Sequence, residues 1–127
     1  VIGTRDLSES ALGWCTYNGD HMSMYGVNAT IPKTLIRWMI ESLIKGGTFE
    51  SSSDALRDIA DTPISPELLP PDASGRIAQQ TESIVGPYAL HDFFLYYMLR
   101  YGFSPAKIYF LACKAFKDDF DGETIKK

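Results

Sequence analysis

The most apolar stretch of this 127-residue sequence reads YALHDFFLYYMLRY and covers residues 88–101. Pro87 precedes it and Gly102 follows it, and these residue types favour the start and the end of a helix. One face of the predicted helix consists of Leu90, Phe93, Phe94, Tyr97, Met98 and Tyr101. Leu95, Tyr96 and Leu99 make the other face apolar as well. A helix that is apolar all round is buried on several sides, which is what we expect here.

A second helix is predicted immediately downstream. Ser104 can cap it, and Pro105 suits the first helical position. Its core face is predicted to consist of Ile108, Leu111, Ala112, Ala115 and Phe116. Phe110 instead shares a stripe with Lys107 and Lys114. The tail, residues 121–127, resembles the first turn of one more helix.

Upstream, Pro32 favours the first turn of a helix that Gly46-Gly47 ends. Apolar residues recur at helical spacing, at Ile36, Met39, Ile40, Leu43 and Ile44. Arg37, Glu41 and Lys45 form the opposite stripe, with opposite charges four residues apart. Ser51-Ser52-Ser53 can cap a further helix over residues 54–60.

The N-terminal part predicts a strand followed by a helix. Val1 to Thr4 resemble the last residues of a buried strand, and Asp6 with Glu9 resembles a helix-capping pair. The helix is expected over Leu7 to Thr16, and residues 21–30 show no clean period and are expected to form an ordered loop. Residues 62–78, rich in Pro, Ser and Asp, predict a functional or mobile loop. The chain is therefore mainly helical, with one strand remnant that indicates an α/β parent.

Composition excludes several functional classes. The formal net charge is -4 and no basic block exists, which argues against a nucleic-acid partner. No stretch is long and apolar enough to cross a membrane. Cys15 and Cys113 belong to no C-x-x-C pair, which argues against a structural zinc site and favours a reducing, cytoplasmic compartment.

Residues 4–9 can carry chemistry. A strand end followed by a helix N-terminus presents free N–H groups to an anion, and Thr4 adds a hydroxyl. A carboxylate at Glu9 beside phosphates suggests Mg²⁺. On the residues alone, a plain capping pair without a ligand is the favoured reading. Lys33 opposes the helix dipole, so it is either a phosphate contact or a solvated surface lysine.

Other candidates are less specific. Trp14 and Tyr17 can stack on a flat ring, although packing into the core is the simpler reading. Cys15 has no histidine near it in sequence to activate it as a nucleophile, and His21 and His91 show no metal-ligand spacing. The pair His91-Asp92 is interpreted as a polar spot on a buried helix.

Several runs of sequence resemble the glutamine-dependent NAD synthetases. They are Leu7-Ser8-Glu9, Gly13-Trp14-Cys15-Thr16-Tyr17, Ile31-Pro32-Lys33-Thr34-Leu35 and Leu90-His91-Asp92-Phe93-Phe94-Leu95-Tyr96-Tyr97. The likeness extends from about Gly3 to Phe120. It implies that residues 1–127 are a mainly α fragment. This fragment would be the helical C-terminal part of a Rossmann-like α/β ATP-pyrophosphatase domain, which is adenine nucleotide alpha hydrolase-like.

The resemblance also implies a reaction. ATP adenylates the nicotinate carboxylate of deamido-NAD and releases pyrophosphate, and ammonia derived from glutamine then displaces AMP to give NAD. The substrates and cofactors implied are ATP, deamido-NAD and Mg²⁺, with ammonia supplied by a glutaminase domain that is absent from this sequence. The family's Ser-Gly-Gly-x-Asp-Ser phosphate loop is absent too, so the chain alone is expected to be inactive. The family forms homo-oligomers, and we expect association here.

The resemblance assigns roles to individual residues. Thr4, Lys33 and Ser65 match family positions that contact ATP. Glu9 matches an acidic residue associated with Mg²⁺ and the deamido-NAD pocket, and Trp14, Cys15, Thr16 and Tyr17 match the stretch that lines deamido-NAD. Arg5 and Ser10 depart from the family pattern, which has a small residue and Leu or Ile at these two positions. Two alternatives remain at this point, another ligase of the ATP-pyrophosphatase type and a non-catalytic helical interaction module.

Overall fold

The computed structural model describes residues 1–14, 19, 22–62, 64 and 81–126 of the chain. Helices dominate this part, and they are α1 (Leu7–Leu12), α2 (Lys33–Lys45), α3 (Ser53–Asp61), α4 (Thr81–Val85), α5 (Tyr88–Tyr101), α6 (Pro105–Ala115) and α7 (Gly122–Lys126). A short 3-10 helix, η2 (Glu50–Ser52), precedes α3. Two strands, β1 (Ile2–Gly3) and β2 (Tyr25–Gly26), complete the described elements. The prediction of a mainly helical chain is confirmed.

The two strands form a small parallel sheet. Ile2 pairs with Tyr25 and Gly3 pairs with Gly26, and α1 lies between the strands in sequence. The predicted strand at the N-terminus is therefore confirmed, but its expected burial is wrong, because Ile2 is 68% exposed. The second strand was missed within the loop expected over residues 21–30, because two residues are too few to show an alternating pattern.

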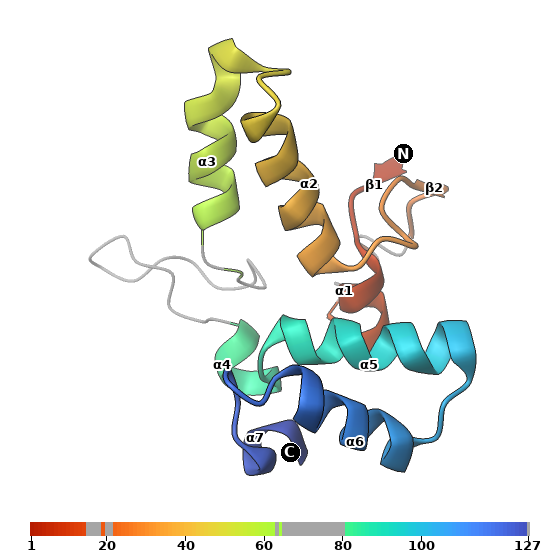
Figure 1. The fold of residues 1–127 in the computed structure, drawn as a ribbon. Coiled ribbons are helices and arrows are strands. Elements are labelled where there is room, and N and C mark those ends of the chain that lie inside the picture. Colours follow the sequence, from red (N-terminus) through yellow and green to blue (C-terminus); the bar gives the residue numbers. More distant parts are fainter. Residues whose placement is uncertain (15–18, 20–21, 63, 65–80, 127) are drawn as a thin grey trace, which may run out of the picture.

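The helices form two groups (Figure 1). Helices α2 and α3 lie side by side as an arm, while α5 lies across the molecule with α6 packed along it and α7 packed against α6. Helix α1 contacts both α2 and α5, so it lies where the two groups meet. This meeting point brings residues from distant parts of the sequence together.

The core lies between α5, α6 and α7. Its fully buried members are Leu90, Ala112 and Ile125. Partly buried aromatic rings pack against them, with Phe93 and Phe116 in an edge-on contact whose ring centroids are 5.3 Å apart. No residue of α2 is buried, so the arm depends less on apolar burial than the α5–α7 part does.

Several predicted helix bounds are confirmed. Helix α5 covers residues 88–101 as expected, and α2 and α3 lie within two residues of their predicted bounds. Helix α1, predicted to reach Thr16, ends at Leu12, because Gly13 takes a left-handed conformation with φ of 75° that closes the helix. Ser104 precedes Pro105 as expected, but its side chain makes no capping hydrogen bond. Helix α4 was not predicted.

Burial differs from the prediction on three helices. On α5, Leu99 and Tyr96 of the second apolar face are 62% and 53% exposed, while Leu95 is half-buried. Met98 and Tyr101, which were predicted for the first face, are exposed as well. On α2, Met39 and Leu43 are exposed, and on α6 the expected core residue Ala115 is exposed too. Helical spacing identifies an apolar face, but it does not identify which element covers that face.

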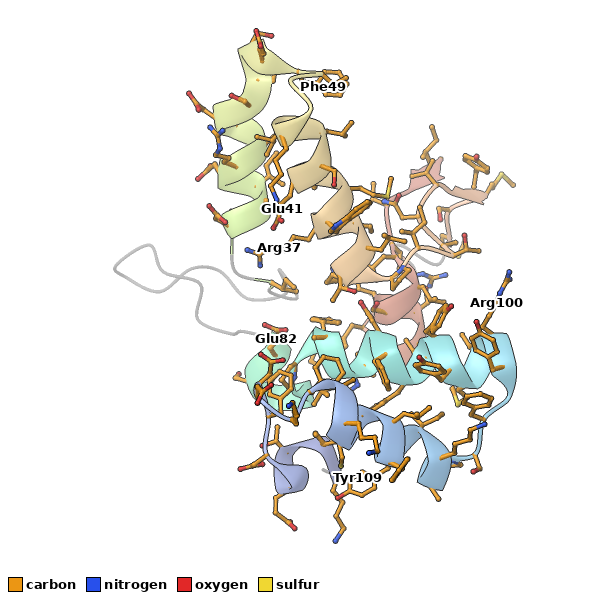
Figure 2. All side chains as sticks on the ribbon, viewed as in Figure 1. Arg37, Glu41, Phe49, Glu82, Arg100 and Tyr109 are labelled. Atoms are coloured by element: carbon orange, nitrogen blue, oxygen red, sulfur yellow. The ribbon has the colours of Figure 1, made fainter. Side chains whose placement is uncertain are left out.

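The charged stripe of α2 is partly confirmed. The side chains of Arg37 and Glu41 pair at 3.3 Å, four residues apart, and Arg37 also reaches Asp61 of α3 at 3.5 Å. Figure 2 shows Arg37 and Glu41 on the side of α2 that faces α3. All three side chains are exposed, so these pairs contribute well under about 1 kcal/mol each.

Candidate functional site

Lys33 joins the start of α2 to the start of α1. Its ammonium lies 2.8 Å from Oδ2 of Asp6 and 2.7 Å from Oε1 of Glu9. The Asp6 side chain is 4% exposed, and those of Lys33 and Glu9 are 19% and 28% exposed. These three residues are called the Lys33 cluster below. Lys33 is therefore not a solvated surface lysine, which corrects that alternative.

The capping pair at α1 is confirmed. Oδ1 of Asp6 accepts a hydrogen bond from the Glu9 amide at 2.8 Å, and Oε2 of Glu9 accepts one from the Asp6 amide at 3.1 Å. The Leu7 amide donates to the Ile31 carbonyl at 3.0 Å. The protein itself therefore satisfies two of the first amides of α1, those of Leu7 and Glu9. The anion site at this turn stays a prediction.

Among the remaining predicted site residues, the structure describes Thr4 and Trp14. Thr4 is exposed just after β1, and its carbonyl accepts a hydrogen bond from the Asn28 side chain at 3.3 Å. Trp14 is half-buried after α1, and its amide donates to the Glu9 carbonyl at 2.9 Å. Cys15, Thr16, Tyr17 and Ser65 lie outside the described residues. The structure thus brings Glu9 and Lys33 into contact, with Thr4 and Trp14 flanking α1.

The charges of the cluster influence the protonation of Lys33. Burial by itself lowers the pKa of the ammonium, but the hydrogen bonds and negative charges of Asp6 and Glu9 outweigh burial and raise the pKa above 10.5. The lysine therefore stays charged at neutral pH. Its ammonium also lies 5.6 Å from the centre of the Tyr88 ring, a cation–π distance.

Tyr88 is the buried wall of the cluster, at 2% exposed. Burial is the main cause that raises the pKa of its phenol to about 12; the charge of Lys33 opposes the shift, and the nearby carboxylates of Glu9, Asp6 and Glu82 add to it. The ring is therefore neutral under physiological conditions. It shields one side of the ammonium from solvent and brings no negative charge of its own.

Asp92 was missed as a site residue, because the sequence indicated only a polar spot on a buried helix. Its carboxylate is 6% exposed and accepts hydrogen bonds from the Ser8 hydroxyl, from the Thr34 amide at 2.8 Å and from the Thr34 hydroxyl at 2.7 Å. One sequence signal was available: a carboxylate inside the most apolar helix requires partners. Which partners it would find could not be inferred from the sequence.

The carboxylates of Asp6 and Glu9 are of the ligand type that Mg²⁺ prefers. Each of their four oxygens already has a partner, which is Lys33 or a backbone amide. In this arrangement the pair does not fit a metal ion, since the Lys33 ammonium lies 2.7–2.8 Å from both carboxylates and would repel a second cation there. Among the described residues, no group of three His, Cys, Asp or Glu side chains could hold a metal. Metal binding by Glu9 stays a prediction.

A separate concavity of about 610 Å³ lies between α5, α6 and α7, and Phe94, Ile108 and Ile125 are among its lining residues. None of the predicted site residues that the structure describes, which are Thr4, Glu9, Trp14 and Lys33, lines it. The Lys33 cluster is therefore the place where the structure and the predicted site coincide.

Within the described ranges, no helix is both long and apolar enough to cross a membrane.

The chain was compared with known proteins. It matches no protein-family model. It is 50% identical over 120 residues to the glutamine-dependent NAD(+) synthetase of Mycobacterium leprae, and 52% identical over 120 residues to those of Mycobacterium bovis and Mycobacterium tuberculosis. Each match covers 93% of this chain. The chain spans only 17–18% of the length of these curated relatives.

The resemblance predicted from the sequence is confirmed. An identity of 50–52% over 120 residues is far above what a shared short motif would give. Over 93% of its length, this chain is similar to one segment of the glutamine-dependent NAD(+) synthetases.

Proposed function

We propose that this chain is part of a glutamine-dependent NAD(+) synthetase and contributes one wall of its ATP and deamido-NAD site. The observation that carries the proposal is the 50–52% identity to such enzymes over 93% of the chain. The reaction is an ATP-dependent amidation. The carboxylate of deamido-NAD becomes an acyl adenylate, and ammonia replaces AMP. Activation is needed because a free carboxylate is a poor acceptor for ammonia.

The parent domain in this proposal has a Rossmann-like α/β fold. Support comes from β1 and β2, which are parallel neighbours with a helix between them in sequence. Parallel strands require a crossover connection, and a helical crossover is the usual one in α/β domains. In this proposal, other parts of the protein supply the phosphate loop and the glutaminase domain that delivers ammonia.

The proposed roles divide the site residues by substrate. Thr4, Lys33 and Ser65 contact ATP, whereas Glu9 and residues 14–17 line the deamido-NAD pocket. The contact between Lys33 and Glu9 supports this division, because it places an ATP residue beside a deamido-NAD residue. Adenylation requires such closeness, since the α-phosphate and the carboxylate must meet.

Lys33 supplies a fixed positive charge in this scheme. Its charge is secured by Asp6 and Glu9, and the ring of Tyr88 covers one side. An ammonium held in one place can orient a phosphate without first losing the freedom of a flexible side chain. The proposed protein is cytoplasmic and associates with copies of itself. No reaction step is assigned to Mg²⁺.

The proposal is tested in the full-length protein that contains this sequence. With ATP, deamido-NAD and glutamine or ammonia, we expect NAD, AMP and pyrophosphate in equal amounts. Lys33→Met should raise the KM for ATP by about tenfold or more, as the loss of a charged hydrogen bond predicts. Lys45→Met, at the other end of α2, is the matched control and should change little. Absence of AMP formation with deamido-NAD would overturn the proposal.

A further inference from the structure

Asp92 joins three helices at a single buried carboxylate. It lies on α5, and its hydrogen-bond donors are Ser8 on α1 and Thr34 on α2, which are 84 and 58 residues away in sequence. The residue is only 6% exposed. A buried carboxylate is costly unless its oxygens are satisfied, and here each oxygen accepts at least one hydrogen bond.

The carboxylate caps α2 from outside that helix. Pro32 occupies the capping position of α2, and it makes no side-chain capping hydrogen bond. Asp92 accepts from the Thr34 amide in its place, and a negative charge at this end of a helix is favourable. Ser8 completes the cap, because its hydroxyl accepts from the Lys33 amide at 2.9 Å and donates to Asp92.

These contacts fix the backbone on both sides of the Lys33 side chain. The Lys33 amide is held through Ser8, and the next residue, Thr34, is held by Asp92 directly. Ser8 also lies in α1 between Asp6 and Glu9, the two residues that the Lys33 ammonium touches. The Asp92 carboxylate thus fixes the position of the Lys33 backbone relative to the backbone of Asp6 and Glu9.

We propose that Asp92 is a positioning residue for Lys33, and that its carboxylate sets where the Lys33 ammonium lies at the junction of α1 and α2. The effect of Asp92 on the use of ATP rests on the proposed function. The effect of Asp92 on where the Lys33 ammonium lies does not, since it concerns the structure alone. The two parts therefore have separate measurements.

The structural measurement is the place of the Lys33 side chain, followed by NMR through nuclear Overhauser contacts between its terminal methylene protons and the Tyr88 ring, which lies 5.6 Å from the ammonium. The variants are Asp92→Asn, Ser8→Ala and Thr34→Val. The last two leave the charge of Asp92 in place and remove only hydrogen bonds. Asp61→Asn, which neutralises an exposed carboxylate that also pairs with α2, is the control. We expect the contacts between Lys33 and the Tyr88 ring to weaken in the first three variants and to stay unchanged in the control.

The kinetic measurement is the split between KM and kcat in the full-length protein. For Asp92→Asn we expect the KM for ATP to rise by about tenfold, with kcat at saturating ATP falling less than about threefold, as for a charged hydrogen-bond partner made neutral. A purely structural residue would instead reduce the amount of active protein and hence kcat, with KM unchanged. Asp92→Glu, which keeps the charge, should recover part of the affinity.

Two results would overturn the proposal. One is a set of contacts between Lys33 and the Tyr88 ring that stays as in the wild type in Asp92→Asn and Ser8→Ala. The other is a fall in kcat alone. If the wild-type protein forms no AMP with deamido-NAD, the proposed function fails, while the NMR contacts of Lys33 still decide whether Asp92 positions it.

Discussion

The ammonium of Lys33 lies 2.7 Å from the carboxylate of Glu9, although the two residues are 24 positions apart in sequence. A second carboxylate, that of Asp6, lies 2.8 Å from the same ammonium. One positive charge therefore faces two negative ones within partly buried surroundings. This pairing links the start of α1 to the start of α2, and it makes the stability of that junction depend on charge.

Replacing Lys33 by methionine should destabilise the fold. The change leaves the Asp6 and Glu9 carboxylates facing each other without a counter-ion, one of them almost fully buried. We expect a loss of about 1–3 kcal/mol in the free energy of unfolding, the usual range for a partner removed from a charged group. Urea denaturation measures it. Lys45→Met, at an exposed helix end, should lose less than about 0.5 kcal/mol. Equal losses would contradict the prediction.

Alkaline pH should destabilise the protein through Tyr88. The pKa of its phenol is about 12 in the fold, against 10.0 ordinarily, so the unfolded chain loses this proton first. Stability that is complete below pH 10.0 should fall as the pH rises towards about 12, by up to about 3 kcal/mol. Lys33, with its pKa raised above 10.5, should add a loss in the same direction as the pH passes through its folded pKa.

The variant Tyr88→Phe separates these two contributions. It should flatten the part of the profile that Tyr88 causes and leave the part that Lys33 causes. Denaturant unfolding at a series of alkaline pH values, together with the absorbance of tyrosinate, gives the measurement. A profile for Tyr88→Phe that superimposes on the wild type would show that Tyr88 does not shift its pKa on folding.

Ile125 should matter more to stability than its place in a five-residue helix suggests. It is 5% exposed and packs with Leu90 and Ala112 in the core. Ile125→Ala should cost about 2–4 kcal/mol, as for other buried large-to-small changes. Ile59→Ala on α3, where the side chain is 61% exposed, is the matched control and should cost less than about 1 kcal/mol. Thermal unfolding of the two variants compares them.

The exposed face of α5 predicts self-association. Leu99, Tyr96 and Tyr101 are all more than half exposed, and the two tyrosine hydroxyls lie 3.2 Å apart. Adjacent exposed apolar groups favour contact between molecules. Sedimentation velocity should show association that increases with protein concentration and is weakened by Leu99→Lys. Ile59→Lys, on the exposed surface of α3, should leave it unchanged. A wild-type chain that remains monomeric at high concentration would contradict this prediction.

Residues that begin, cap or end a helix determined how well the fold could be predicted. Helix α5 was predicted with its bounds because Pro87 and Gly102 frame it. The Asp6–Glu9 cap was predicted because both residues lie within one turn. In contrast, the pairing of Glu9 with Lys33 depends on how two helices pack. Spacing within either helix carries no information about it.

The same limit explains why Asp92 was not identified as a site residue. Its partners, Ser8 and Thr34, lie on other helices, and nothing within α5 indicates them. The resemblance to NAD synthetases identified Glu9 and Lys33 as site residues, but it gave no account of what holds them in place. Positioning residues of this kind emerge only from tertiary structure.

The last prediction separates the two roles of Glu9, as a helix cap and as a site residue. Glu9→Gln keeps an oxygen that can accept from the Asp6 amide, so the cap survives, while the ion pair with Lys33 is lost. We therefore expect a loss of about 1 kcal/mol or less in the free energy of unfolding. If Glu9 takes part in substrate or metal binding, deamido-NAD-dependent pyrophosphate release by the full-length protein should fall by far more than this loss explains.

The matched control is Glu41→Gln, which removes an exposed ion pair with Arg37 on α2 and should change neither stability nor rate appreciably. Rates are measured across a magnesium titration, because amides are poorer magnesium ligands than carboxylates. A rate that recovers at high magnesium would support a metal role for Glu9. A low rate at every magnesium concentration would support a role in binding deamido-NAD. A rate near wild type throughout would show that Glu9 serves the fold alone, as cap and counter-ion.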